Sequence, residues 1–322
     1  MNTLILFLIK EAFGLKAFYF HLYSVALHAA NTVILYNIIL ILFSGKEQCK
    51  HISFLIAFLF LFHPLQIEAV AWISASKWLL VTFFMLLSVL FYLQYTIHSN
   101  SGCFVYSFLF FFLAFLSKEV SVVLPLLLLV IEIFFLKRGF FAMRILLPYF
   151  GFSLIFGIVT LQFPIFQPDM QQLRIEGTFN FVDNIVFSFG CLADYFFYLI
   201  IPIHRGWALG LITGQENMLP TASAVVVIIF CVGLYYFTDD IKLMGCFLFF
   251  VTSVFFTLPI FPAIKTCLIA DRYVYFAGIG IWSSLIYMLH DKNNYIKALL
   301  YSYMLYLVIF DLIETGKWYN VL

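Results

Sequence analysis

The chain is a succession of long apolar segments separated by short polar stretches, and this alternation restricts the folds open to it. Hydrophobic residues make up 65% of its 322 residues, whereas charged residues make up only 10%. A soluble core could not bury so many apolar side chains, but a membrane-spanning helix needs about 20 of them in succession. The sequence therefore predicts an all-α fold, a polytopic bundle of transmembrane helices that forms a single domain over residues 1–322.

The apolar segments predict about ten membrane spans. The predicted spans cover residues 19–43, 52–62, 78–95, 103–116, 120–136, 142–162, 221–238, 243–261, 273–290 and 296–313. Residues 163–220 form one long connection, which we predict to be extracytoplasmic. Within it, residues 184–202 are apolar except for Asp194, and we interpret them as a helix lying in the membrane interface. The alternative, a further span at 184–202, would place Asp271 on the opposite membrane face from Glu68.

With 184–202 at the interface, the polar loops fall into two sets. The first set consists of short basic turns that carry Lys46, Lys50, Lys137, Arg138, Arg144, Lys242, Lys292 and Lys297. The positive-inside rule predicts that these turns are cytoplasmic. The second set contains the more elaborate polar motifs, and we therefore expect those motifs to meet on the extracytoplasmic side.

Composition also narrows the range of partners. The formal net charge is +1, so nothing in the overall charge favours a nucleic acid. The six cysteines form no CxxC pair, and we interpret them as small buried hydrophobic residues. Because no metal-ligand spacing occurs, we expect neither a metal nor a cofactor.

The first polar cluster lies in the stretch HPLQIEAVAW at residues 63–72. Pro64 is expected to end one helix, with the next restarting near Ile67, which places His63 and Glu68 at a helix junction. This pattern is compatible with a functional site. Taken alone it is more typical of a plain helix start, in which Glu68 interacts with the helix dipole and Trp72 anchors the chain at the interface.

Two further clusters belong to the same set of loops. Ser117-Lys118-Glu119 separates two apolar segments with almost no loop, and it could be no more than a polar turn with a local ion pair. Asp271 and Arg272 are adjacent, so we expect them to have different partners. An arginine offers a fixed fork of donors that suits a phosphate group, although Arg272 could instead reach lipid headgroups.

Polar residues also occur inside the predicted spans. His21, Ser24, His28 and Asn31 recur at helical spacing and should share one face. We interpret them as partners in hydrogen bonds between helices rather than as a lining for substrate. Glu132 lies near the end of a span, and we expect its side chain to extend to the membrane surface.

Four stretches together carry a resemblance to a known family. They are residues 14–39 with the pattern FHL…LHAAN, HPLQIEAVAW at 63–72, LSKEVSVVLPLLL at 116–128, and ADRYVY at 270–275. In this order they resemble the tetratricopeptide-repeat-containing transmembrane O-mannosyltransferases and their bacterial relatives. That family belongs to the GT-C class of glycosyltransferases, so the resemblance implies a GT-C-like bundle in a membrane, more in keeping with the bacterial inner membrane than with the endoplasmic reticulum.

The resemblance implies transfer of a sugar from a polyprenyl- or dolichyl-phosphate donor to a hydroxyl of an acceptor protein or glycan. Arg272 and Lys118 would contact the lipid phosphate, and Glu68 and Asp271 are the candidate catalytic carboxylates. Glu68, Asp271 and Glu119 would position the acceptor or the cations, and His63 would hydrogen-bond one of these carboxylates. The expected partners are therefore the lipid-linked donor, the acceptor and the bilayer.

The family also has parts that the chain does not match. In the family, an additional helix and an acidic loop usually precede the region that the first residues of this chain resemble. The resemblance therefore predicts that the catalytic base lies upstream of Met1. Two other functions fit the same residues. Intramembrane His, Glu and Asp side chains are typical of transporters, and a relative without the base would be a non-catalytic scaffold.

Overall fold

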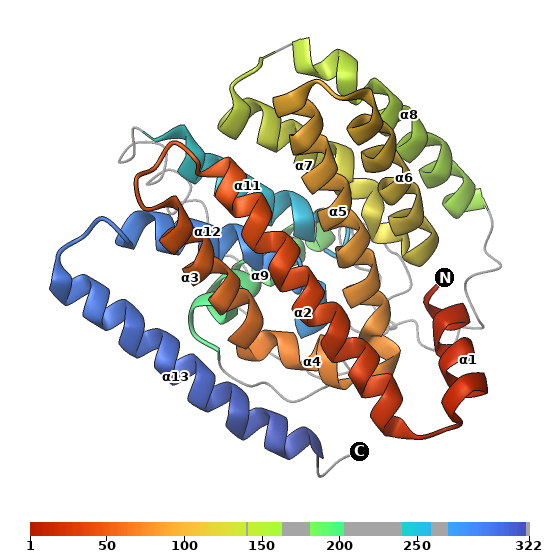
Figure 1. Cartoon of the computed structure of the whole chain (residues 1–322), viewed down its shortest axis with the longest axis horizontal. Coiled ribbons are helices and arrows are strands. Elements are labelled where there is room, and N and C mark those ends of the chain that lie inside the picture. The colour runs from red at the N-terminus through yellow and green to blue at the C-terminus, as the bar shows by residue number, and fades with distance from the viewer. Residues whose placement is uncertain (140, 163–180, 203–239, 259–269, 320–322) are drawn as a thin grey trace.

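A computed structural model describes residues 1–139, 141–162, 181–202, 240–258 and 270–319 (Figure 1). Within these ranges every regular element is helical, which confirms the predicted all-α class. The span predicted at 221–238 lies outside the described residues, and so does most of the long connection at 163–220. The other predicted apolar segments each coincide with a helix or with a series of helical turns.

The first half of the chain builds the centre of the bundle. Its main helices are α1 (Asn2–Phe13), α2 (Ala17–Leu42), α3 (Cys49–Phe62), α5 (Ser76–His98) and α6 (Ser101–Ser117). Figure 1 shows α2 running diagonally between α3 and α5, with α6 paired to α5 on the far side. The short helix α1 was not predicted. It is attached through the Asn2 side chain, whose Nδ2 donates to Ser76 Oγ at 3.0 Å.

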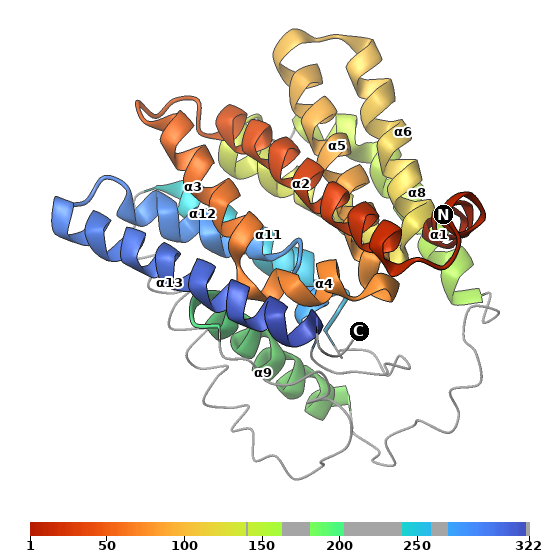
Figure 2. The same cartoon turned by 60° about the horizontal axis from the view of Figure 1, so that its bottom comes forward.

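The second half of the chain adds helices around this centre. They are α7 (Leu124–Ile131), α8 (Phe141–Gln162), α9 (Phe181–Ile200), α11 (Ile241–Phe255), α12 (Gly278–Leu289) and α13 (Asn294–Tyr319). Helix α13 lies at the periphery in both views and exposes many large apolar side chains (Figures 1 and 2). Figure 2 places α9 beside α13, where Tyr303 Oη donates to the Ile200 carbonyl at 2.6 Å.

Several helices have the length and composition of membrane spans. Four of them qualify in the described ranges, at residues 17–42, 73–98, 119–136 and 294–317. A fifth is obtained if α3 and the helical turns at 64–71, bent by 54° from each other, count as one span. The apolar stretches assessed in the remaining helices are 10–17 residues long, with 143–159 in α8 and 188–200 in α9. A multi-pass membrane protein fits this pattern, and the predicted total of ten spans stays a prediction.

The bend between α3 and the next helical segment follows from Pro64. Helix α3 ends at Phe62, a 3₁₀ turn covers Pro64–Gln66, and α4 (Ile67–Ala71) begins at the predicted restart. Proline fixes its own φ angle and has no backbone N–H, so it starts the new turn readily but cannot continue the old helix. The bend places Glu68 at the end of the bundle rather than along its side.

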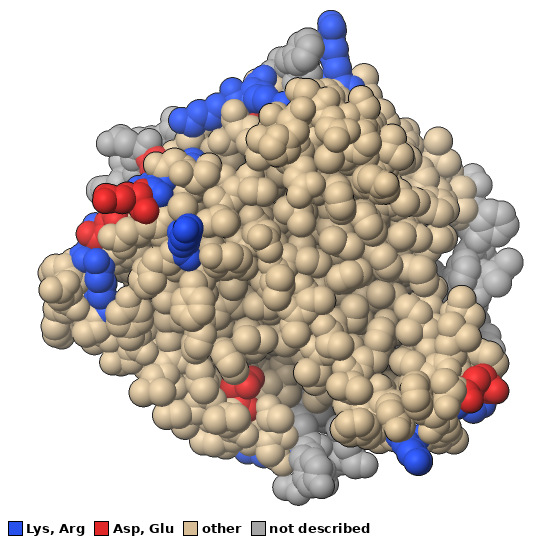
Figure 3. Space-filling model, in the orientation of Figure 1, with Lys and Arg blue, Asp and Glu red and all other residues tan. Residues whose placement is uncertain are grey.

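The basic turns meet at the opposite end of the bundle from Glu68. Lys46 Nζ lies 3.5 Å from Asp291 Oδ2, and Lys242 Nζ donates to the Leu42 carbonyl at 3.1 Å. Figure 3 shows a broad uncharged face, with most of the visible Lys and Arg side chains along its upper and left edges. The turns between α2 and α3 and between α12 and α13 therefore share one end, as the sequence predicts.

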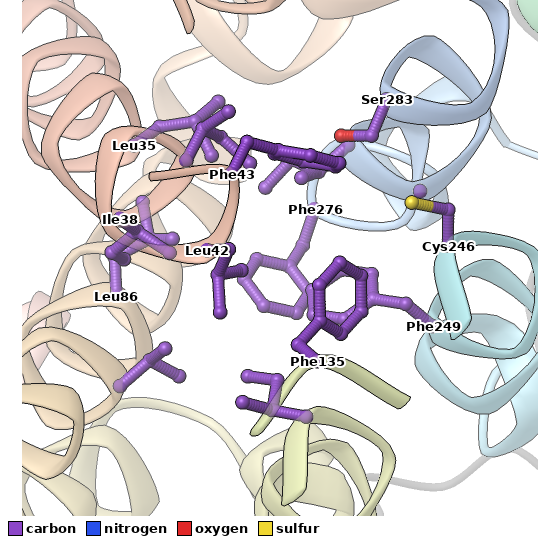
Figure 4. Close-up of a pocket in the computed structure, with 15 residues that line it drawn as sticks. Leu35, Ile38, Leu42, Phe43, Leu86, Phe135, Cys246, Phe249, Phe276 and Ser283 are labelled. Carbon is purple, nitrogen blue, oxygen red and sulfur yellow. The ribbon is translucent and has the colours of Figure 1, made fainter. Parts of the chain in front are cut away.

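Close helix packing and a small cavity characterise the core near this basic end. A Cβ atom on Gly280 of α12 would lie 2.5 Å from the Cys246 carbonyl oxygen of α11, so the two backbones touch there. The cavity between α2, α5, α11 and α12 is almost entirely apolar, with Phe43, Phe135 and Phe276 among its lining (Figure 4). It contains none of the predicted site residues.

Glu132 corrects one of the predictions. Instead of extending to the surface, its side chain is fully buried. Tyr92 Oη donates to its Oε1 at 2.5 Å, and Arg138 Nε donates to its Oε2 at 2.9 Å. A carboxylate that is deprived of water needs such donors. The sequence could not reveal them, because Tyr92 belongs to another helix and Arg138 folds back from beyond a left-handed turn at Lys137.

We expect Tyr92→Phe to lower the free energy of unfolding by about 1.5–3 kcal/mol, the usual contribution of a hydrogen bond to a charged group. The substitution leaves one oxygen of buried Glu132 with fewer donors. Chemical unfolding in detergent micelles would measure the loss. Tyr95→Phe is the matched control, since Tyr95 is on the same helix and donates no hydrogen bond in the described part of the chain. Equal effects of the two substitutions would contradict this account.

Candidate functional site

An ion pair between Glu68 and Arg272 joins two of the three predicted clusters. Glu68 Oε1 accepts from the Arg272 guanidinium, and Glu68 Oε2 accepts from the Arg272 backbone N–H at 2.8 Å. Each side chain is only 12% exposed, so the pair is largely shielded from water. Glu68 therefore holds both the charge and the backbone of Arg272 in place.

Aromatic rings extend this pair toward the third cluster. The Arg272 guanidinium carbon lies 4.9 Å from the centre of the Trp72 ring and 5.0 Å from that of Tyr273. The rings of Tyr273 and Trp78 have centroids 5.3 Å apart, and Lys118 Nζ lies 4.6 Å from the Trp78 centroid. Cations gain electrostatic energy over such ring faces. All three predicted clusters thus form one continuous surface.

Lys118 and Glu119 form the outer part of this surface. Lys118 Nζ donates to Glu119 Oε1 at 3.0 Å, with side-chain exposures of 15% and 63%. The polar turn with a local ion pair that the sequence suggests is therefore present. Lys118 is the single residue between α6 and the 3₁₀ turn Glu119–Val123, so these two elements together fix its position. Lys77 lies within electrostatic range of Lys118, Glu119 and Arg272.

Asp271 differs from the other carboxylates of the site. In the described part of the chain its carboxylate makes no hydrogen bond or ion pair, although it is electrostatically coupled to Glu68 and Arg272. Burial, followed by the charge of Glu68, raises the pKa of Asp271 from 3.8 to about 7, against the opposing effect of Arg272. Arg272 is bound by Glu68, whereas the separate partner predicted for Asp271 is not found among the described residues. Asp271 is the carboxylate that is available for exchange of a proton near neutral pH.

Buried hydrogen bonds hold the Asp271–Tyr273 turn from the side of the core. Tyr275 Oη lies 2.8 Å from His28 Nδ1 and accepts from Asn31 Nδ2 at 3.1 Å, while Gln66 Nε2 donates to the Tyr275 carbonyl at 3.3 Å. His28 and Asn31 also bond to the Leu61 and Leu79 carbonyls of neighbouring helices, as predicted, whereas Ser24 bonds to the Phe20 carbonyl of its own helix. Tyr195 on α9 accepts from the Ala270 N–H at 3.1 Å.

His63 corrects a second prediction, because it bonds none of the site's carboxylates. Its ring is fully buried, and Nδ1 accepts from the Leu65 N–H at 3.3 Å, so the side chain caps the turn that Pro64 begins. The ring centroid also lies 4.8 Å from that of Trp282. Because the imidazole accepts this local hydrogen bond, the His63 side chain lies in the core and away from Glu68.

The raised pKa of Asp271 makes stability depend on pH. Between about pH 4 and pH 7 the folded protein keeps a proton on Asp271 that the unfolded chain releases, so this residue makes the protein less stable as the pH rises through that window. We expect Asp271→Asn to remove this part of the pH dependence. Free energies of unfolding measured for both proteins from pH 4 to pH 8 test this, and parallel curves would contradict it.

Comparison of the chain with protein-family models, with curated proteins and with solved structures finds no match. The site is therefore interpreted from its own residues. In the part of the chain that the structure describes, no group of three or more His, Cys, Asp or Glu is arranged to hold a metal ion.

Sequence reasoning missed the aromatic members of the site. Trp78 and Tyr273 were not singled out, although each directly follows a cation, Lys77 or Arg272. Tyr195 and Tyr275 were missed as well, and nothing local marks them. The pairing of a cation with the next aromatic residue, at Lys77-Trp78 and again at Arg272-Tyr273, was the available signal.

Proposed function

We propose that the chain is a membrane-embedded glycosyltransferase that moves a sugar from a polyprenyl- or dolichyl-phosphate donor to an acceptor hydroxyl. The observation that carries this proposal is the convergence of Glu68, Arg272 and Lys118 with two tryptophans at one end of an apolar bundle. A lipid-linked phosphate presents its charged group at the level of such a site, where lipid gives way to water. The resemblance adds a GT-C-like arrangement of about ten spans, the bacterial inner membrane and protein O-mannosylation to the proposal.

The proposed chemistry assigns distinct roles to the charged residues. The acceptor oxygen attacks the anomeric carbon of the sugar, its proton passes to a carboxylate, and the bond from that carbon to the phosphate oxygen breaks. Arg272 and Lys118 stabilise the negative charge on the departing phosphate. Glu68 serves Arg272 as a positioning residue, because both of its oxygens are already engaged. In place of the base that the resemblance puts elsewhere, we assign the proton to Asp271, whose carboxylate makes no hydrogen bond or ion pair among the described residues.

Transfer of a radiolabelled sugar from a polyprenyl-phosphate donor to membrane acceptors tests this function. Purified chain in liposomes is expected to transfer label, and Arg272→Gln should reduce the rate by a factor of about 100 or more. Lys50→Gln, at the basic end, is the control and should leave the rate unchanged. A folded wild-type chain that transfers no label from mannosyl or glucosyl donors would contradict the proposal and favour a non-catalytic scaffold.

A further inference from the structure

Lys77 is the cation of the candidate site that has no carboxylate of its own. Arg272 is bound by Glu68, and Lys118 is bound by Glu119. Within the described residues Lys77 makes no ion pair or hydrogen bond, and the residue as a whole is exposed. It therefore presents an unneutralised ammonium group beside two cations that are already paired.

The surroundings of Lys77 oppose a purely structural role. It is the second residue of α5, where the positive end of the helix dipole disfavours a cation. Its electrostatic neighbours include two like charges, Lys118 and Arg272, whereas Glu119 is engaged by Lys118. The helix dipole and the two like charges disfavour a cation here, and the charge of Glu119 offsets them only in part. An exposed cation in these surroundings would gain energy from a negatively charged ligand bound beside it.

The charges also indicate where that ligand meets the site. The Arg272 and Lys118 side chains are 12% and 15% exposed, and each lies against a tryptophan ring. Lys77 is exposed, so it is the cation that an anion arriving from outside can reach without displacing a ring or a carboxylate. Its flexible stem lets the ammonium follow the anion toward the two shielded cations.

We propose that Lys77 binds the phosphate group of the ligand and delivers it to the surface formed by Arg272 and Lys118. The ligand class is a phosphate monoester or diester. This inference rests on the proposed function only for the identity of that ligand as a lipid-linked sugar. The recognised chemistry is the phosphate, which a lipid or free inorganic phosphate can supply.

Binding of farnesyl phosphate to the full chain in phosphatidylcholine nanodiscs tests the proposal by calorimetry. Lys77→Gln should weaken binding about tenfold or more, the loss expected for one charge-assisted hydrogen bond. Lys77→Arg keeps the charge and should bind within about threefold of the wild type. Lys50→Gln at the basic end should bind as the wild type does. Inorganic phosphate should displace farnesyl phosphate from the wild type.

Two results would overturn the proposal. One is wild-type affinity for farnesyl phosphate in Lys77→Gln. The other is displacement by farnesol, which has no phosphate, where inorganic phosphate fails to displace. The proposed function fails separately: phosphate binding that depends on Lys77, together with no sugar transfer by the wild type, would contradict the transferase and leave this inference standing.

Discussion

Arg272→Gln is expected to destabilise the folded protein by about 3–5 kcal/mol, because it leaves the Glu68 carboxylate shielded from water without its counter-charge. Glu68→Gln should cost a similar amount for the converse reason. The double substitution should cost clearly less than the sum, since neither charge then remains unpaired. Unfolding by denaturant in detergent micelles, applied to all four proteins, gives the coupling energy between the two sites.

Glu119→Gln is the matched control for this experiment. It also removes a carboxylate from an ion pair of the same site, but its side chain is 63% exposed. Water and salt screen such pairs, so the expected cost is below about 1 kcal/mol. Equal losses for Glu68→Gln and Glu119→Gln, or strict additivity in the double variant, would show that Glu68 and Arg272 do not act as a unit.

Gly280→Ala is expected to cost about 3 kcal/mol, at the upper end of the range for overpacking. The new Cβ would lie 2.5 Å from the Cys246 carbonyl oxygen and 2.7 Å from the Phe250 nitrogen. Both are backbone atoms of α11, so no side chain can turn aside and the two helices must separate. Helices that meet in a membrane depend on such small residues for their close approach.

Gly151→Ala provides the comparison for this second substitution. Gly151 is also in a helix, α8, and a Cβ there would meet no atom within 4 Å. Alanine favours helix over glycine by about 1 kcal/mol, so this variant should be slightly more stable than the wild type. The two substitutions share the same chemistry and differ in their surroundings. Similar melting temperatures for both variants would contradict the close contact of α11 and α12.

The sequence predicted the helices well and the interior less well. Apolar runs marked the helices in the described ranges because the whole length of each segment contributes to the pattern. Local rules were also sufficient at Pro64, where the bend depends on one residue. The helix predicted to begin at residue 273 instead begins at Gly278, because the preceding residues form a 3₁₀ turn held from outside by Glu68.

The alternation of the loops predicted that the three clusters meet at the candidate site. It did not predict which residues form hydrogen bonds or ion pairs with one another. His63 was expected beside a carboxylate, and its local cap with Leu65 took precedence. Glu132 was expected at the surface, and donors from elsewhere in the fold made its burial possible. Such partners depend on the three-dimensional arrangement, which spacing along one segment does not contain.

The Glu68–Arg272 contact also has a consequence for how the chain is made. Its two residues are 204 positions apart, so Glu68 leaves the ribosome long before Arg272. At the usual rates of protein synthesis that interval is roughly 10–40 seconds. During this time the first helices are inserting, while the carboxylate at their end still lacks its arginine. The site is completed only late in synthesis, so ribosome-bound chains that stop before residue 272 should carry Glu68 accessible to carboxyl-modifying reagents.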